Sequence, residues 1–168
     1  TDIMREKHNI DGAGKDDFTV YTTASFLETL ENITNALKLF LSMIAAVSLV
    51  VGGVGIMNIM LVAVNERTRE IGLRKAIGAT SENVQYQFLI ESVVLTLLGG
   101  IVGVLFGIII SGLIAVVANF LEYHWQFVVT IPSILLGVGV AGCVGIVFGW
   151  YPAKKASDLE PIEALRYE

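Results

Sequence analysis

Six ionisable side chains lie within one segment of ten residues. They are Glu66, Arg67, Arg69, Glu70, Arg74 and Lys75. Glu70 precedes Arg74 by four residues, which is the stabilising order for an ion pair on a helix. Gly78 stands where a helix end favours a left-handed residue, and Thr80 or Ser81 can cap the next helix. Ile71, Leu73, Ala76 and Ile77 are expected to give this small helix an apolar side among its charges. The chemistry that suits the segment is recognition: it could lie on lipid headgroups, dock on another protein, or simply be a solvated loop.

Signatures of catalysis are missing from the sequence. It has no P-loop, GxGxxG, HExxH or CxxC motif. His8 and His124 lie far apart, which indicates no metal site, and Cys143 is the single cysteine, which excludes an internal disulfide. Glu91 is an ionisable residue near the membrane level, but water or an arginine partner is close by, which favours a structural role. We therefore expect no enzyme activity and no bound cofactor in this segment.

The composition indicates a membrane protein. Of the 168 residues, 54% are hydrophobic and 16% are charged, whereas soluble domains carry about 25% charged residues. This excludes a disordered chain, a nucleic-acid-binding domain and a disulfide scaffold. Three stretches lack Asp, Glu, Lys and Arg: 39–64, 92–121 and 123–153. Each exceeds the roughly 20 residues that cross a bilayer, so the sequence predicts an all-α membrane protein with three transmembrane helices.

The distribution of Lys and Arg predicts the orientation of these helices. Basic residues occur in the loop 65–83 and in the tail after Ala153, whereas the connection 119–130 has none. The loop and the C-terminal tail should therefore be cytoplasmic, and residues 1–38 external. An external N-terminus normally needs a signal peptide or an earlier span, so we expect this chain to be the C-terminal piece of a longer polypeptide with at least one more span upstream.

The region before the first span has two predicted parts. Residues 18–23 (FTVYTT) read as the last strand of an external α+β domain. From Ala24 apolar residues recur at helical spacing and continue into the first span without a breaker. We interpret 25–64 as a stalk helix that enters the membrane; an amphipathic helix packed on its own external domain is the alternative.

Two stripes of small residues at four-residue spacing predict close helix packing. The first span after the loop carries Gly99, Gly103, Gly107 and Ser111, and the last span carries Gly137, Ala141, Gly145 and Gly149. Small residues let helix backbones approach closely in lipid. The stripes serve packing within one chain and dimerisation equally well.

Three motifs resemble the permease core of the MacB-like (FtsX-like) ABC transporters. They are VGGVGIMNIML at 51–61 leading into ERTREIGLRK at 66–75, QFLIES at 87–92, and YPAKKA at 151–156 followed by EPIEALRYE at 160–168. The resemblance covers about residues 16–168. It implies a four-span permease, of which this chain holds spans 2–4.

The resemblance also implies a division of the chain. It gives the end of an external domain (1–24), a stalk and first visible span (25–64), a cytoplasmic loop (65–83), a second span (84–118), an external shoulder loop (119–130), a third span (131–151) and a cytoplasmic tail (152–168). The loop would be the coupling helix that docks on the ATPase. Its residues are Glu66, Arg67, Thr68, Arg69, Glu70, Ile71, Gly72, Leu73, Arg74, Lys75, Ala76, Ile77, Gly78 and Ala79.

The function implied by the resemblance is mechanical. A permease of this kind transmits ATP-driven movement from a cytoplasmic ATPase to the external domain, and so exports a peptide, macrolide or lipoprotein-class substrate. ATP and Mg²⁺ would sit on the ATPase, which is either a partner or a fused domain. Further expected partners are a second permease copy (homodimer or close homologue), an external adaptor protein and the lipid bilayer of the bacterial inner membrane. The alternatives are an FtsX-like permease that activates external cell-wall enzymes, and a membrane anchor or receptor without an ATPase.

Overall fold

The computed structural model describes residues 22–166, and this part of the chain is helical with no strand. The helices are α2 (Thr23–Glu66), α3 (Thr68–Ala76), α4 (Ser81–Phe120), α5 (Ile131–Ser157) and α6 (Pro161–Arg166). The predicted strand at 18–23 falls outside the described residues except for its last two positions, and Thr23 already begins α2. The rest of the predicted external domain also lies outside them.

Three of these helices, α2, α4 and α5, are long and apolar enough to cross a membrane. They contain 44, 40 and 27 residues. Helices are the expected form for such segments, because lipid offers no partners to backbone N–H and C=O groups. The prediction of three membrane-spanning helices agrees with this result.

The chain divides into two compact units, residues 1–46 and 47–168, and the boundary falls within α2. In the described part of the first unit, α2 begins with a reciprocal cap. The backbone N–H of Ser25 donates to Thr22 Oγ1 at 3.1 Å, and that of Thr22 donates to Ser25 Oγ at 3.0 Å. This arrangement satisfies N–H groups that the first helical turn leaves without partners. From Phe26 to Ala46 every side chain is exposed.

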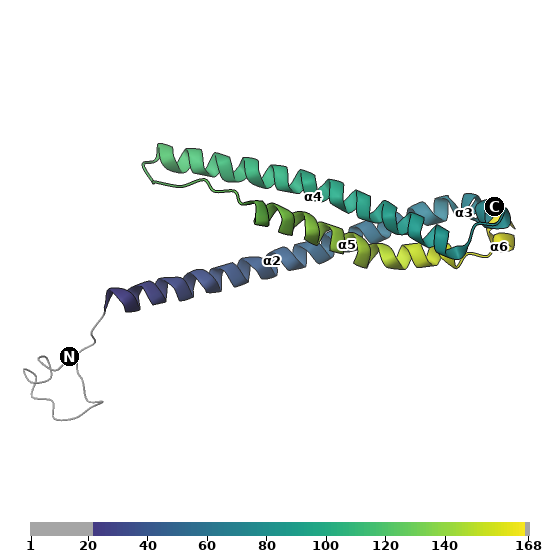
Figure 1. Cartoon of the computed structure of the whole chain (residues 1–168), viewed down its shortest axis with the longest axis horizontal. Helices are drawn as coiled ribbons and strands as arrows, with labels where there is room; N and C mark the ends of the chain where they lie inside the picture. The colour runs from purple at the N-terminus through teal and green to yellow at the C-terminus, as the bar shows by residue number, and fades with distance from the viewer. Residues whose placement is uncertain (1–21, 167–168) are drawn as a thin grey trace, which may run out of the picture. The chain divides into compact units, whose positions relative to one another are not determined.

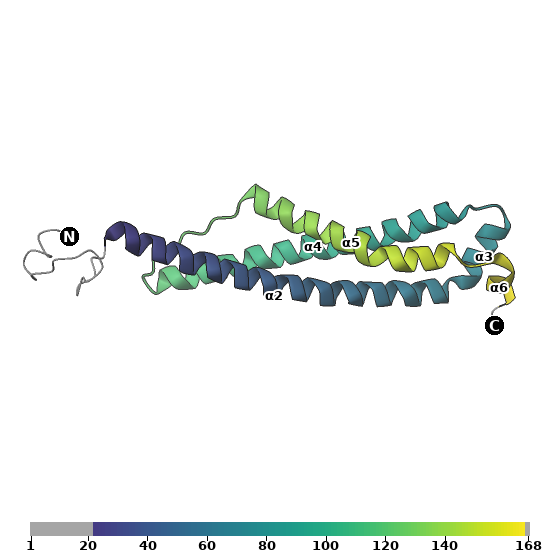
Figure 2. The same cartoon turned by 90° about the horizontal axis from the view of Figure 1, so that it is seen from below.

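In the second unit α4 and α5 lie side by side over much of their length (Figures 1 and 2). Ser92 is the central polar contact: its Oγ donates to the backbone oxygen of Gly145 at 3.0 Å. A Cβ built on Gly149 would overlap the Ser92 side chain, so the two backbones approach more closely than a larger residue allows. Gly53 of α2 makes a similar close approach to the ring of Phe148 in α5.

Burial is concentrated where α2 ends, α4 begins and α5 ends, which we call the α3 end. The core there consists of Met60, Val64, Ile71, Val84, Phe88, Ala153 and Ala156. The connection between α4 and α5, residues 121–130, is what we call the loop end, and all its residues are exposed. The elements that position the charged segment are therefore the best-packed part of the described chain.

Candidate docking site on α3

The predicted coupling segment is a separate short helix held between two sharp turns. Glu66 ends α2, Arg67 forms the turn, Thr68–Ala76 form α3, and residues 77–79 leave it. The hydroxyl of Thr68 donates to the backbone oxygens of Val64 and Asn65, at 3.1 and 2.8 Å, and so satisfies the last turn of α2.

The far end of α3 has the geometry that the sequence predicts. Gly78 has a φ of 109°, which places it in the left-handed region. The backbone N–H of Gly78 donates to Lys75 O, and that of Ala79 donates to Arg74 O at 3.0 Å, the paired bonds of a Schellman motif. Thr80 then caps α4 by accepting the backbone N–H of Asn83. Both end signals read from the sequence are thus confirmed.

Two arginines fix α3 to α4. The Nη1 atom of Arg67 lies 3.2 Å from Glu91 Oε1, which gives Glu91 the arginine partner that favoured a structural role. Arg74 donates to Gln87 Oε1 at 2.8 Å and also pairs with Glu70, the helical ion pair that the sequence predicts. Both arginines keep part of their side chains in solvent, so the contacts set the direction of α3 more than they stabilise the fold.

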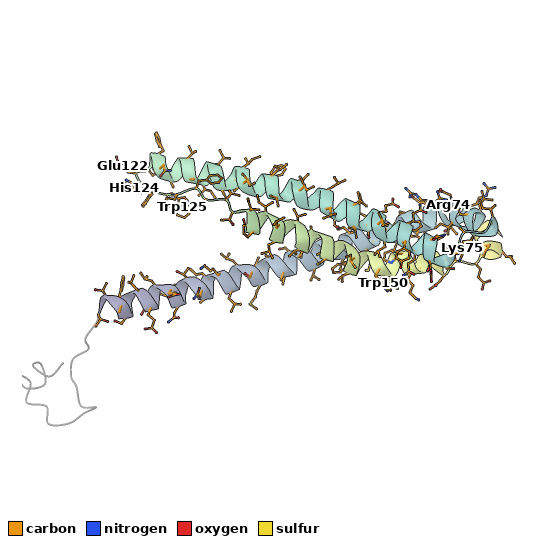
Figure 3. The ribbon with its side chains drawn as sticks, in the orientation of Figure 1. Arg74, Lys75, Glu122, His124, Trp125 and Trp150 are labelled. Atoms are coloured by element: carbon orange, nitrogen blue, oxygen red, sulfur yellow. The ribbon has the colours of Figure 1, made fainter. Side chains whose placement is uncertain are left out.

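A different set of contacts joins α3 to the C-terminal part of the chain. Lys75 Nζ donates to the backbone oxygens of Ser157 and Leu159, at 2.8 and 2.7 Å. A Cβ on Gly72 would crowd that of Ala164, so α6 lies directly against α3. Figure 3 shows Arg74 and Lys75 near the end where α4 begins, whereas Glu122, His124 and Trp125 lie at the opposite end of α4.

The buried and exposed faces of α3 differ from the apolar side expected from the sequence. Ile71 is 2% exposed and belongs to the core, whereas Leu73 and Ile77 are 55% and 79% exposed. The prediction that Ile71, Leu73, Ala76 and Ile77 form one apolar side is therefore wrong. Leu73 follows Ile71 by two residues, which is about 200° around the helix, so the four residues divide between two faces. The exposed face combines Leu73 and Ile77 with the charge of Arg69.

The two small-residue stripes have different surroundings. All four stripe residues of α5 face α4: Gly137 towards Val104, Ala141 towards Gly100, Gly145 towards Thr96 and Gly149 towards Ser92. On α4, by contrast, Gly99, Gly103 and Gly107 have open space where a Cβ would be, and Ser111 is exposed. The contact face of α4 is shifted by one residue from its predicted stripe. Packing of that stripe against another chain stays a prediction.

Sequence reasoning gave no role to two groups of residues that the structure makes important. Ser92 and Thr96 form the close contact with α5, although they lie outside the predicted small-residue stripe of α4. Leu159 and Ala164 contact α3 from the tail, whose motif was noted only for its resemblance. The described residues contain no group of three side chains that would hold a metal ion.

Comparison with known proteins gives one family. The family described as FtsX-like permease C-terminal matches residues 42–161. The chain is 49% identical over 167 residues to the macrolide export ATP-binding/permease protein MacB of Syntrophobacter fumaroxidans, covering 99% of this chain and 23% of that protein. It is 45% identical over 163 residues to the probable syringafactin export ATP-binding/permease protein SyfD of Pseudomonas syringae, covering 97% and 24%.

A MacB of Bdellovibrio bacteriovorus is similarly close, 48% identical over 168 residues, with 99% of this chain and 25% of that protein covered. The chain thus spans about a quarter of the length of these curated relatives. Together with the three apolar helices, the family makes this a multi-pass membrane protein. The chain belongs to the FtsX-like permease C-terminal family.

Proposed function

We propose that this chain is the C-terminal permease part of an ABC exporter and that α3 docks on its ATPase. The relatives are named as export proteins that combine an ATP-binding and a permease function. In this proposal ATP and Mg²⁺ bind to the ATPase, fused or separate. The permease transmits the resulting movement to an external domain.

The observation that carries the proposal is the combination of anchoring and exposure on α3. One face is fixed to the membrane helices by Ile71 in the core and by the Arg67–Glu91 pair. The other presents Leu73 and Ile77 to solvent although both are large and apolar. Exposed apolar side chains on a firmly held helix suit a protein interface, because a partner gains from covering them and a push on them reaches the spans.

The distribution of charge supports a cytoplasmic position for α3. Arg67, Arg69 and Arg74 lie at the α3 end, as do Lys154 and Lys155 in the last turn of α5. The loop end carries only Glu122 as a charged residue. By the positive-inside rule the α3 end and the C-terminus then face the cytoplasm.

The remaining parts of the proposal concern the other side of the membrane. The 44 residues of α2 would measure about 66 Å as a helix, whereas a bilayer core is about 30 Å thick. The excess suits a stalk that leads to an external domain. A second permease copy and an external adaptor would complete the assembly, and a peptide, macrolide or lipoprotein-class substrate would be exported.

The docking assignment is tested by placing charge on the exposed face of α3. In the full-length transporter with its ATPase, reconstituted in nanodiscs, Leu73→Asp with Ile77→Asp should lower ATP hydrolysis about tenfold or more, since unpaired carboxylates would be buried in the interface. Val128→Asp makes the same change at an exposed residue of the loop end, and it should leave hydrolysis near the wild-type rate. Unchanged hydrolysis in the α3 double variant, with normal membrane insertion, would remove the docking assignment.

A further inference from the structure

Lys75 occupies an unusual position for a lysine on a short exposed helix. Its ammonium group does not extend into solvent but donates to the backbone oxygens of Ser157 and Leu159, where α5 ends. The last carbonyls of a helix have no intrahelical partners and carry the negative end of its dipole. A lysine from another element is therefore a strong cap for α5, and this cap bridges more than 80 residues of sequence.

A second contact lies beside this cap and has no charge. Gly72 precedes Lys75 by one turn and receives the methyl group of Ala164 from α6, with no room for a side chain between them. Both ribbon views place α6 next to α3 (Figures 1 and 2). The tail after α5 thus folds back on α3 and is held at two points.

The helices α3 and α5 are not consecutive in the chain, because α4 lies between them. In sequence α3 is joined to α2 by Arg67 and to α4 by residues 77–80, so a displacement of α3 reaches those two helices through the backbone. It reaches the end of α5 beside α3 only through noncovalent contacts. The polar contacts described there are the two bonds of Lys75, one to Ser157, the last residue of α5, and one to Leu159 just after it.

We infer that Lys75 is a positioning residue that couples α3 to α5, so that α3, α6 and the end of α5 move as one body. The inference rests on the proposed function, in which the ATPase moves α3. All three spans then receive the movement, although only two are joined to α3 by the backbone. The C-terminal helix α6 is thereby part of the transmission element and not a loose tail.

The variants that test this inference keep the fold of α3 and change only the cap. Lys75→Met keeps an unbranched apolar side chain, one heavy atom shorter, but removes the charge and the donors. Lys75→Arg restores positive charge and N–H donors. Lys154→Met is the matched control, because it removes a lysine from the same end of α5, where Lys154 is exposed.

The measurement is a distance between spin labels at Ala76 on α3 and Asp158 after α5, both exposed positions. It uses the full-length transporter with its ATPase in nanodiscs, with Cys143→Ser and no other reactive cysteine. Wild type and Lys154→Met should give the same narrow distance distribution without nucleotide and with ATP plus vanadate. Lys75→Met should broaden it and shift it on ATP binding, and Lys75→Arg should restore it.

ATP hydrolysis, measured on the same Lys75 and Lys154 variants without spin labels, gives a second readout. Lys75→Met should reduce turnover about tenfold, the effect of losing hydrogen bonds from a charged donor, while Lys75→Arg stays within about threefold of wild type. A Lys75→Met distance distribution identical to that of wild type in both states would overturn the inference. So would a wild-type distance that changes on ATP binding.

The two proposals fail in different ways. If the Asp substitutions at Leu73 and Ile77 leave hydrolysis unchanged, the docking function is wrong whatever Lys75 does. If those substitutions abolish hydrolysis but Lys75→Met leaves both the distance and the turnover unchanged, docking stands and the coupling of α3 to α5 is wrong.

Discussion

The α3 end and the loop end of the second unit are built in opposite ways. At the α3 end four helices contribute to one buried core, and hydrogen bonds from Arg67, Arg74 and Lys75 join α3 to its neighbours. At the loop end all ten residues from 121 to 130 are exposed, and the side-chain hydrogen bonds described between this connection and α4 are the two that join Asn119 to the backbone of Trp125. Mechanical connection is therefore concentrated at the end that carries the charged segment.

The largest expected effect comes from breaking the core at the α3 end. Phe88 is 1% exposed, so Phe88→Ala should lower the free energy of unfolding by about 3 kcal/mol or more, through lost contacts and a cavity. Phe106→Ala on the same helix removes a ring that is 61% exposed, with an expected cost below about 0.5 kcal/mol. Unfolding by sodium dodecyl sulfate in mixed micelles measures both, and equal effects would contradict the comparison.

A smaller effect is expected where α4 and α5 approach closely. Gly149→Leu forces a side chain into Ser92, and overpacking of this kind costs about 1–3 kcal/mol. Gly99→Leu adds the same atoms in open space, so the unfolding temperature should fall for the first variant only. If Gly99→Leu instead changes the oligomeric state in native mass spectrometry, the α4 stripe is an interface between copies.

The ion pair of Arg67 and Glu91 should matter less for stability than its position suggests. Its side chains are 47% and 33% exposed, and exposed pairs contribute about 0.2–1 kcal/mol. Glu91→Gln should therefore destabilise the protein by less than about 1 kcal/mol. The destabilisation caused by Glu91→Gln should also be smaller at high salt, because salt screens exposed charges. Unfolding of the variant and of wild type at two ionic strengths measures this. A loss as large as that of Phe88→Ala would show that the pair is a main support of the α3 end.

The smallest effect is expected at the loop end. Asn119→Ala removes both hydrogen bonds to Trp125, each exposed, so water can replace them and the cost should be local and within about 0.5 kcal/mol. Hydrogen–deuterium exchange should speed up in residues 121–130 and stay unchanged in α3. Faster exchange in α3 would mean that the two ends are coupled.

The sequence predicted features with local causes more fully than those that depend on distant partners. The left-handed Gly78, the cap at Thr80 and the Glu70–Arg74 pair each follow from residues within one or two turns, and the structure has all three. The length and apolarity of the charge-free stretches predicted the three long helices, because lipid leaves the backbone no alternative.

The missed features depend on rotation and on long-range contacts. A four-residue spacing identifies a stripe on a helix, but a shift of one residue turns the helix by about 100°, and so Gly100 and Val104 face α5 in place of Gly99 and Gly103. The contacts of Lys75 with Ser157 and Leu159 join residues more than 80 positions apart, and nothing local to either segment indicates the pairing.

The central claim, that α3 is the docking site of the ATPase, is tested most directly by photo-crosslinking in native membranes. A photoreactive phenylalanine analogue replaces Ile77 in one sample and Val128 in another, both in the full-length protein with its ATPase. We predict crosslinks from position 77 to peptides of the ATP-binding domain, and none from position 128. Absence of such crosslinks at position 77, or equal yields at the two positions, would contradict the claim.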